Sequence, residues 1–388
     1  KPWLMRIASW MTATNATGLP SDLDSAVDST RFGAWLQDRW QAGKSLSLEA
    51  GLRLDWSGVN RRTTVSPRAS ATLRLGEATR LRAGGGLYTQ SPGYEKLIQS
   101  DYFVDLSGDL GRSLLYERAT HAVVSLERDL GAGLLARVEG YWRDLDDLIV
   151  GRLETEEERL ARVATYDFPA ELASSVPTDA IITSFPVNGA TGRSWGFDVL
   201  VQKRPTPGAR LTGWASYTWG RAEREVYGRT LPFEYDRRHA ASLVGSWRFG
   251  PKWELGATVR AFSGFPRTPV LGLRVAADGT DPERLVPSLD AEGRYVYETQ
   301  SGGVSNLNTA RLPAFFRLDL RLSWRPRGAA GRWLLYLDVI NATNRDNVGQ
   351  VDASLAHDPG SALDQPRLVL EPTAAIPFLP SIGVRFRF

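Results

Sequence analysis

The sequence of 388 residues contains no cysteine and only three histidines. Without cysteine there is no disulfide framework and no thiolate metal site. The histidines, His121, His239 and His357, lie far apart and lack the spacing of a metal-binding motif. We interpret His239, at the start of a predicted strand, as structural. We therefore expect no metal site, no cofactor, no catalytic residue and no nucleophile elbow of the G-x-S-x-G kind.

Long hydrophobic runs are also absent. Hydrophobic residues make up 42% of the chain, but no stretch approaches the eighteen or more apolar residues of a membrane helix. That absence does not exclude a membrane β-barrel, whose strands alternate apolar and polar residues. The 47 basic and 44 acidic residues nearly balance and form no basic block, which argues against a nucleic-acid partner.

The first ten residues, KPWLMRIASW, lack the basic region, apolar core and small-residue cleavage site of a signal peptide. We expect the chain to be a mature product or the C-terminal part of a longer protein.

Alternation with a period of two is the dominant pattern. In the last residues, IPFLPSIGVRFRF, every second position from Ile382 to Phe388 is apolar, with Arg385 and Arg387 between. Residues 44–57 alternate in the same way from Leu46 to Trp56. A helix would need apolar spacings of three and four, so these stretches are predicted strands with one apolar and one polar face.

About fourteen such strands are predicted along the chain. They cover residues 3–12, 31–42, 44–57, 66–76, 79–90, 116–129, 133–150, 190–204, 208–224, 236–249, 252–266, 313–325, 332–345 and 376–388. Charged residues recur on one face of many of these strands. Charged side chains on one face of so many strands must be in contact with water, for example in a wide barrel lumen.

The connections between these strands alternate in length. Short turns are predicted at residues 43, 77–78, 130–132, 205–207, 250–251 and 326–331. Long connections are predicted at residues 13–29, 58–65, 91–115, 151–189, 225–235, 267–312 and 346–375. Up-and-down outer-membrane barrels sort their loops in this way, with short periplasmic turns and long extracellular loops. The fold class is therefore all-β, a transmembrane antiparallel up-and-down β-barrel; a large soluble β-rich binding protein is the alternative.

Aromatic residues support a membrane barrel. The chain has 13 Trp, 12 Tyr and 14 Phe, gathered near predicted strand ends. Six tryptophans lie on apolar strand faces, at positions 56, 142, 195, 219, 247 and 324. Amphipathic rings at these places are typical of the aromatic girdle at the lipid headgroups.

Several sequence segments resemble segments of the barrel of TonB-dependent outer-membrane receptors and occur in the same order along the chain. They are SPRASATLRL (66–75), LRAGGGLYTQSPGYEKL (81–97), LPFEYDRRHAASLVGSWRF (231–249), AFSGFPRTPV (261–270), LPAFFRLDLRLSW (312–324) and LYLDVINATNRDNV (335–348). The terminal Phe388, with Phe386, resembles the family's outer-membrane assembly signal. The resemblance extends over nearly the whole chain from about residue 30.

The resemblance implies a bacterial outer-membrane receptor. Its partners would be outer-membrane lipid, the barrel-assembly machinery, the TonB system and a small solute: a siderophore, vitamin, metal complex, saccharide or peptide. Family members have twenty-two strands and an N-terminal plug domain that contacts TonB. We find no plug in this sequence and interpret residues 1–388 as the C-terminal portion of such a barrel.

Candidate ligand-binding residues lie in the predicted loops and at their rims. They are Tyr88, Tyr94, Tyr102, Tyr235, Arg237 and Arg238. The aromatic ones could stack on a ligand or belong to the girdle. The acidic run ETEEERLAR (154–162) is interpreted as a solvated loop, with cation or partner contact as the alternative. Two rival functions remain open, a passive porin-like channel of fourteen strands and an outer-membrane hydrolase.

Overall fold

The computed structural model describes residues 30–92, 98–99, 102–103, 110–326, 332–356 and 366–386. Most of them form one antiparallel 14-stranded sheet, in which neighbouring strands follow the order of the chain. Only β11 lies off this path, paired with β10 alone. The predicted strand at residues 3–12 lies outside the described residues, while each of the other predicted strands corresponds to one strand of the sheet.

The strands of the main sheet are long. They are β1 (Arg31–Ala42), β2 (Leu46–Ser57), β3 (Arg62–Arg74), β4 (Thr79–Gln90), β7 (Glu117–Gly131), β8 (Leu134–Leu153), β9 (Ile182–Lys203), β10 (Leu211–Val226), β11 (Arg229–Pro232), β12 (His239–Phe249), β13 (Trp253–Phe262), β20 (Phe315–Trp324), β21 (Trp333–Ile340) and β24 (Leu379–Phe386). Most exceed the 9–11 residues with which a tilted strand crosses a bilayer.

The remaining elements belong to the connections. Short strands are β5 (Ile98–Gln99), β6 (Tyr102–Phe103), β14 (Pro266–Arg267), β15 (Gly272–Val275), β16 (Ala277–Asp278), β17 (Val286–Pro287), β18 (Tyr297–Gln300), β19 (Ala310–Arg311), β22 (Val348–Ala356) and β23 (Arg367–Ala374). The helices are α1 (Leu110–Ser113), α2 (Glu156–Ala164) and two 3-10 helices, Ala170–Ser175 and Val304–Asn306. None of the helices in the described part of the chain has the length and apolar character needed to cross a bilayer.

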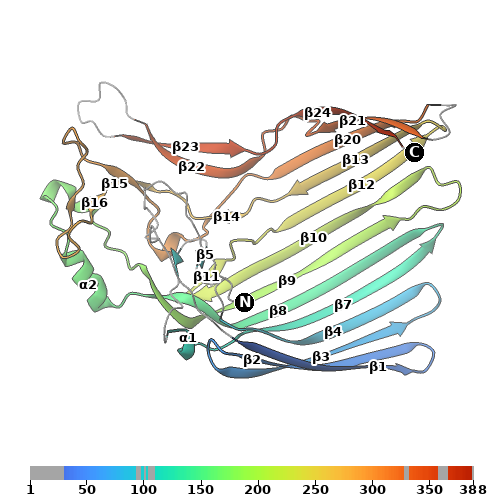
Figure 1. The fold of residues 1–388 in the computed structure, drawn as a ribbon, viewed down its shortest axis with the longest axis horizontal. Helices are drawn as coiled ribbons and strands as arrows, with labels where there is room; N and C mark the ends of the chain where they lie inside the picture. The colour runs from blue at the N-terminus through green and yellow to red at the C-terminus, as the bar shows by residue number, and fades with distance from the viewer. Residues whose placement is uncertain are drawn as a thin grey trace.

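The two ends of the sheet differ. Long connections carrying α2, β15, β16, β22 and β23 gather at one end, on the left in Figure 1, and we call this end the mouth. Tight turns lie at the other end, where β24 also finishes. Gly43 and Gly250 allow two of these turns, because their φ angles of 80° and 84° lie in the left-handed region that favours glycine.

One predicted connection is wrong in length. We expected a long connection at residues 58–65, but β3 begins at Arg62 and pairs with β2 from Ser57 onward. The link is therefore the four residues 58–61, a short hairpin at the mouth. Residues 62–65 (RTTV) carry only one apolar side chain, so the alternation that marks the strand is not visible before residue 66.

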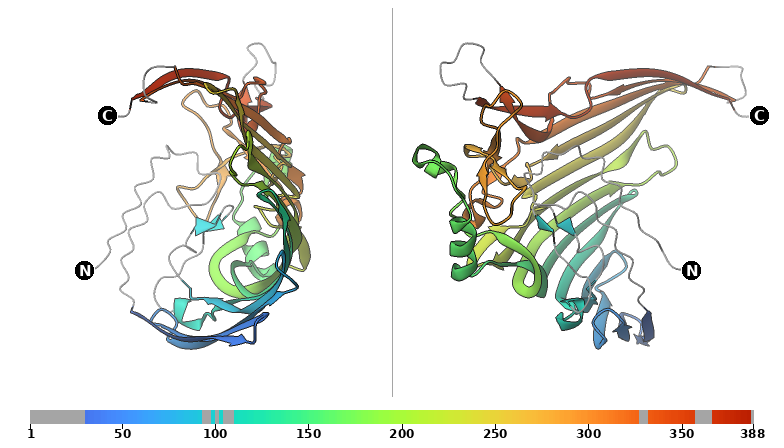
Figure 2. Two further views of the ribbon diagram at one scale, coloured as in Figure 1. Left: turned by 90° about the vertical axis from the view of Figure 1, so that its right-hand side faces the viewer. Right: turned by 60° about the vertical axis from the view of Figure 1, so that its left-hand side comes forward.

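The sheet curves into an open arc, seen end-on in the left panel of Figure 2. Alternate residues differ in exposure along β7: Val124 is 53% exposed, whereas its neighbour Ser125 is 4% exposed. Side chains converge on a concave face and spread on a convex one, so the polar residues line the inside. Within the described residues β1 and β24 each pair on one side only, and the sheet is not closed.

Aromatic rings form two bands on the apolar face, as predicted. Near the mouth Trp142 contacts Trp195, with ring centroids 5.7 Å apart. Near the turns Trp253 stacks on Trp324 at 6.0 Å, and Trp333 lies 4.7 Å from Phe386. These bands have the position of girdles at the two lipid interfaces.

Candidate functional site at the mouth

The only hydrophobic cluster of buried residues found in the described part of the chain lies at the mouth rather than within the sheet. It joins residues from two connections and from neighbouring strands: Leu114, Ile149, Val150, Ala190, Val226, Leu231 and Leu307. Leu307 comes from the connection between β13 and β20, and Leu114 from the one between β4 and β7. The mouth is thus a packed assembly, in which the connections have ordered positions.

Two long connections, 154–181 and 263–314, dock on each other through backbone bonds. The Asp167 amide donates to the Leu285 carbonyl and the Leu285 amide to the Thr165 carbonyl, both at 2.8 Å. The Val275 amide donates to the Ser175 hydroxyl at 3.0 Å. We call this pair of connections the cap.

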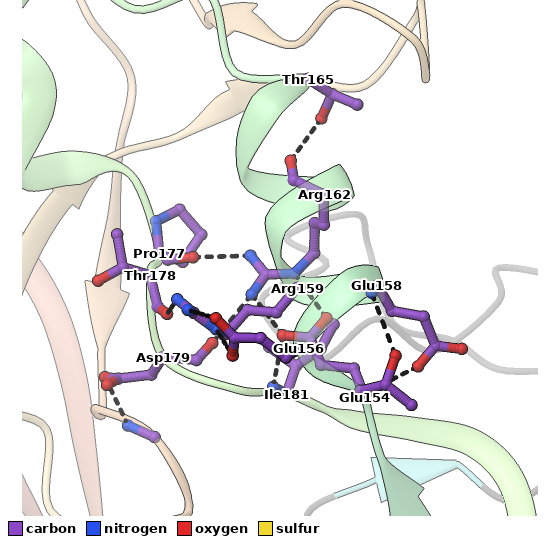
Figure 3. Close-up of polar contacts among 12 residues, drawn as sticks. Glu154, Glu156, Glu158, Arg159, Arg162, Thr165, Pro177, Thr178, Asp179 and Ile181 are labelled. Carbon is purple, nitrogen blue, oxygen red and sulfur yellow. Dashed lines mark hydrogen bonds and ion pairs between the residues drawn. The ribbon is translucent and has the colours of Figure 1, made fainter.

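Helix α2 begins with a capping box. The Thr155 hydroxyl accepts from the Glu158 amide at 3.2 Å, and the Glu158 carboxylate accepts from the Thr155 amide at 2.7 Å. Each of three arginines pairs with one glutamate: Arg152 with Glu158, Arg159 with Glu156, and Arg162 with Glu154. Figure 3 shows the last two pairs, with Arg162 also donating to the Pro177 carbonyl.

These pairs show how the charges of the acidic run are balanced. Hydrogen bonds from Arg152 and the Thr155 amide lower the pKa of Glu158 to about 2. The Arg162 hydrogen bonds, opposed by burial, leave the pKa of Glu154 below its ordinary value. Most of the negative charge is therefore neutralised within the loop. The described residues hold no group of acidic, histidine or cysteine side chains that could bind a metal ion.

Asp236 is a second cross-link of the mouth and is only 1% exposed. Its carboxylate accepts from the Ala222 amide at 2.7 Å, from Arg238 at 2.8 Å and from Arg311. Arg311 also donates to the Asp236 carbonyl at 2.8 Å. Burial tends to raise the pKa of Asp236, but these hydrogen bonds outweigh it and leave the pKa below its ordinary value. Asp236 thus ties β10 to the far end of the cap.

Three of the predicted ligand-binding residues surround this cross-link. Arg238 bonds Asp236, so its charge is largely used within the protein. Arg237 lies over two rings, 4.4 Å from the centroid of Phe262 and 3.9 Å from that of Phe265, and burial lowers its pKa. Tyr235 is 71% exposed and meets Phe265 edge-on at 6.2 Å. Tyr235 is therefore the one of the three that a ligand can reach most readily.

The other predicted residues are placed apart from this group. Tyr88 lies on the inner face of β4, where it stacks on His121 at 4.4 Å. Tyr102 belongs to β6, while Tyr94 and the terminal Phe388 lie outside the described residues. Phe386 is in β24 against Trp333. The ligand-binding role of the tyrosines and the assembly role of Phe386 and Phe388 remain predictions.

Sequence reasoning missed the partners that organise the site. Asp236 lies in the phrase that carried the resemblance, and Arg68 lies on the inner face of β3, over the Tyr88 ring at 4.3 Å. Period-two alternation does place Arg68 on the polar face of its strand, but it gives no sign of the contact with Tyr88. The contact of Asp236 with Arg311 spans 75 residues and leaves no local signal.

The G-x-S-x-G pattern of a nucleophile elbow occurs once in the sequence, but the fold gives it no elbow. Residues 192–196 read GRSWG, which matches G-x-S-x-G. They lie inside β9 and pair with β8 on one side and β10 on the other. A nucleophile elbow needs a sharp strand-to-helix turn, so this stretch is ordinary barrel wall.

Consecutive antiparallel strands, an apolar outer face, a polar inner face and a mouth built from docked loops define a transmembrane up-and-down β-barrel. The family model described as "TonB dependent receptor-like, beta-barrel" matches residues 7–342. The chain therefore belongs to the TonB-dependent receptor family, whose barrels lie in the bacterial outer membrane. In outer-membrane barrels the short turns are periplasmic, so the mouth is extracellular.

Solved structures share this fold. The ferric-catecholate import receptor Fiu from E. coli K12 matches with a TM-score of 0.58 and 13% identity, covering 93% of this chain and 45% of that chain. The FrpB iron transporter from Neisseria meningitidis (F3-3 variant) matches at 0.53 and 14%, covering 93% and 45%. The copper transporter OprC matches at 0.54 and 16%, covering 93% and 48%. The chain spans about half the length of these proteins, and no curated protein matches it.

Proposed function

We propose that this chain is the C-terminal part of the barrel of an outer-membrane receptor that takes up a scarce solute with energy from TonB. The observation that carries the proposal is the family match over residues 7–342 of a barrel wall with a polar inner face. In this proposal the complete barrel has twenty-two strands, and a plug domain outside this sequence contacts TonB. The barrel itself has no enzymatic activity.

The ordered mouth supports ligand capture. Its connections are cross-linked by Asp236 and by the cap, so exposed side chains there have fixed positions. Binding to a preorganised surface avoids part of the entropy cost of ordering loops around a ligand. We propose that Tyr235 is the main contact and that Tyr88, Tyr94, Tyr102, Arg237 and Arg238 contribute to the path of the ligand. The solute belongs to the class of siderophores, vitamins, metal complexes, saccharides or peptides.

The proposal is tested by uptake into cells that express the protein, with and without TonB. Labelled solutes to compare are a ferric catecholate, copper(II), cobalamin, an oligosaccharide and a peptide. We expect one of them to accumulate only when TonB is present. Equal entry of small sugars and of the other solutes in both strains would instead identify a passive channel and refute the proposal.

A matched pair of variants tests the mouth. Tyr235→Ala should reduce uptake of that solute, because it removes the exposed ring beside Phe265. Tyr295→Ala removes another exposed tyrosine from the cap, one that was not predicted to bind, and should leave uptake unchanged. If both variants, or neither, lower uptake, Tyr235 has no specific role in binding.

A further inference from the structure

Basic side chains lie at both ends of the outer face of the barrel wall. On strands β7 and β9, which flank β8, Arg118 and Arg193 are near the mouth, and Arg128 and Lys203 are near the tight turns on the right in Figure 1. Period-two alternation and strand pairing place all four on the outer face, which the exposed Val124 of β7 marks. The two ends of the wall can therefore be compared on the same strands.

Near the mouth these charges are neutralised within the protein. Nη2 of Arg118 lies 2.7 Å from Oδ2 of Asp147, and Nε of Arg193 lies 3.0 Å from Oδ1 of Asp144. Each basic residue at the mouth end of these two strands therefore has its own carboxylate.

Near the turns the carboxylates on either side of Arg128 in the sequence have other partners. Glu127 points to the inner face and pairs with Arg80 at 3.1 Å. Asp129 accepts a hydrogen bond from the Gly131 amide at 2.9 Å. Within the described residues no carboxylate pairs with Arg128. Its guanidinium therefore keeps its full positive charge.

Apolar side chains that face lipid surround Arg128. Leu126 and Leu130, two residues away on either side, are 46% and 53% exposed on the same face. A charged group on a lipid-facing surface is stabilised when its long side chain reaches the headgroup level and meets an anion there. The counter-charge for Arg128 is therefore expected from the membrane.

A second basic residue lies across β8 from Arg128. Arg128 pairs with Ala136 of β8, and Ala136 pairs with Val201, which is two residues before Lys203 on β9. The two basic residues are thus separated by two strand spacings of about 4.8 Å each. The small side chain of Ala136 leaves the space between them open.

The turn that follows Lys203 adds two arginines. Arg204 and Arg210 are exposed, and neither pairs with a carboxylate in the part of the chain that the structure describes. The Lys203 ammonium donates to the Ala132 carbonyl, a neutral partner. We call Arg128, Lys203, Arg204 and Arg210 the basic rim.

The basic rim lies at the level of the aromatic band near the turns. Lys203 pairs with Gly213 of β10, and two residues nearer the turn Leu211 pairs with Trp247. The Trp247 ring lies 5.2 Å from Phe249, which stacks on the band itself at 6.3 Å. Rings of this kind mark the headgroup region of a bilayer. The basic rim is therefore at the depth where lipid phosphates lie.

We propose that the basic rim binds the headgroup of an anionic phospholipid in the periplasmic leaflet. Arginine presents paired N–H donors that match the oxygens of a phosphate, and Lys203 adds a further charge. The position of Arg128 among lipid-facing leucines favours a lipid over a periplasmic protein as the partner. The site is on the outer surface of the wall, so it does not depend on which solute is taken up.

The test compares phosphatidylglycerol with phosphatidylcholine of the same acyl chains. Native mass spectrometry of the full-length protein, titrated with each lipid in detergent, measures both affinities. We expect phosphatidylglycerol to bind about tenfold more tightly, since several basic residues contribute. This preference should shrink at high ionic strength, because exposed charges are screened.

Three single variants locate the site. Arg128→Gln, Lys203→Gln and Arg204→Gln should each weaken phosphatidylglycerol binding by about fivefold, the contribution of one basic residue near an anionic lipid surface. Binding of phosphatidylcholine should stay unchanged. If one variant fails to fold, the other two give the same test.

Arg118→Gln is the matched control, since it removes an arginine from the same face of β7 but one already paired with Asp147. It should leave the affinity for phosphatidylglycerol unchanged. Equal binding of the two lipids, or an equal loss in Arg118→Gln, would overturn the proposal. So would undiminished phosphatidylglycerol binding in all three rim variants, which would mean that the rim meets water or a periplasmic partner instead.

Discussion

Arg162 and Glu154 form a two-point ion pair at the mouth: Nη2 lies 2.7 Å from Oε1 and Nε lies 3.0 Å from Oε2. The Glu154 side chain is 4% exposed. Its Oε1 also accepts from the Ile181 amide at 3.1 Å. One carboxylate therefore fixes both the last turn of α2 and the return of the chain toward β9. We expect the cap to depend on this pair.

Glu154→Gln should loosen the cap without unfolding the barrel. The variant leaves Arg162 without a counter-charge and weakens the bond to Ile181, which we expect to cost about 2 kcal/mol. Hydrogen exchange of the Leu285 and Val275 amides, which donate across the cap, measures this local opening. Glu157→Gln, on the same helix but outside these ion pairs, should have no effect. Unchanged exchange in Glu154→Gln would show that the pair is dispensable.

The cap should also be sensitive to acid. The pKa of Glu154 in the folded protein is below its ordinary value of 4.5, mainly through the Arg162 hydrogen bonds. Such a group contributes stability that is present above its unfolded pKa and is lost as the pH falls through its folded pKa. Protection of the Leu285 amide should therefore be constant above about pH 5 and decline at lower pH. Glu154→Gln should flatten that decline; an unchanged profile would contradict the assignment.

Asp236→Asn should detach the far end of the cap from β10. It removes the charged partner of Arg311 and Arg238 at a site that is almost fully buried. Breaking a buried ion pair on one side costs about 3 kcal/mol. Limited proteolysis of the connection 263–314 should become faster. Asp290→Asn, which affects only a local pair with Arg294 in the same connection, is the control and should be cut at the original rate.

The assignment of the two sheet faces predicts that an arginine at one depth destabilises the barrel on the outer face but not on the inner face. Leu243 on β12 is on the outer face, and Leu243→Arg should destabilise the barrel in lipid vesicles by about 2–4 kcal/mol. Ser216 lies on the inner face of β10 beside Ala215, the partner of Leu243. Ser216→Arg should cost little, because the inner face is wet. Denaturant titration in vesicles measures both, and equal costs would mean that the faces are misassigned.

The assembly signal is predicted from the end of the sequence. Replacing Phe388 by Asp should lower the amount of folded protein in the outer membrane several-fold, because the resemblance assigns this residue to recognition by the assembly machinery. Heat-modifiable migration on gels measures the folded fraction. Phe378→Asp, a change of another aromatic residue near the same strand, is the control. A normal folded fraction in the Phe388 variant would remove the assignment.

Local patterns predicted the wall of this protein because each strand carries its own information. Alternation has a period of two wherever one face meets lipid and the other meets water. Residues 44–57 therefore indicated β2, and the final alternation from Ile382 indicated β24, without knowledge of any partner strand. The link at 58–61 was overestimated because residues 62–65 show no apolar alternation, although they pair with β2.

The candidate site could be predicted only in part. Exposed aromatics such as Tyr235 were found because residue type and loop position are visible in a sequence. The roles of Arg237 and Arg238 were not, since the rings over which Arg237 lies and the Asp236 network depend on distant segments. The helix in the acidic run had a local signal, the Thr155–Glu158 capping box, but its neutral balance of charge depends on Arg162 reaching back to Glu154.

The sequence by itself determined the strands, their two faces and their order, because these follow from residue alternation and from turns between neighbours. The tertiary structure alone decided how the mouth is held together. Asp236 meets Arg311 only because the fold brings segments 75 residues apart to the same end of the sheet. Contacts of this kind depend on the position of the whole chain in space, which no local pattern records.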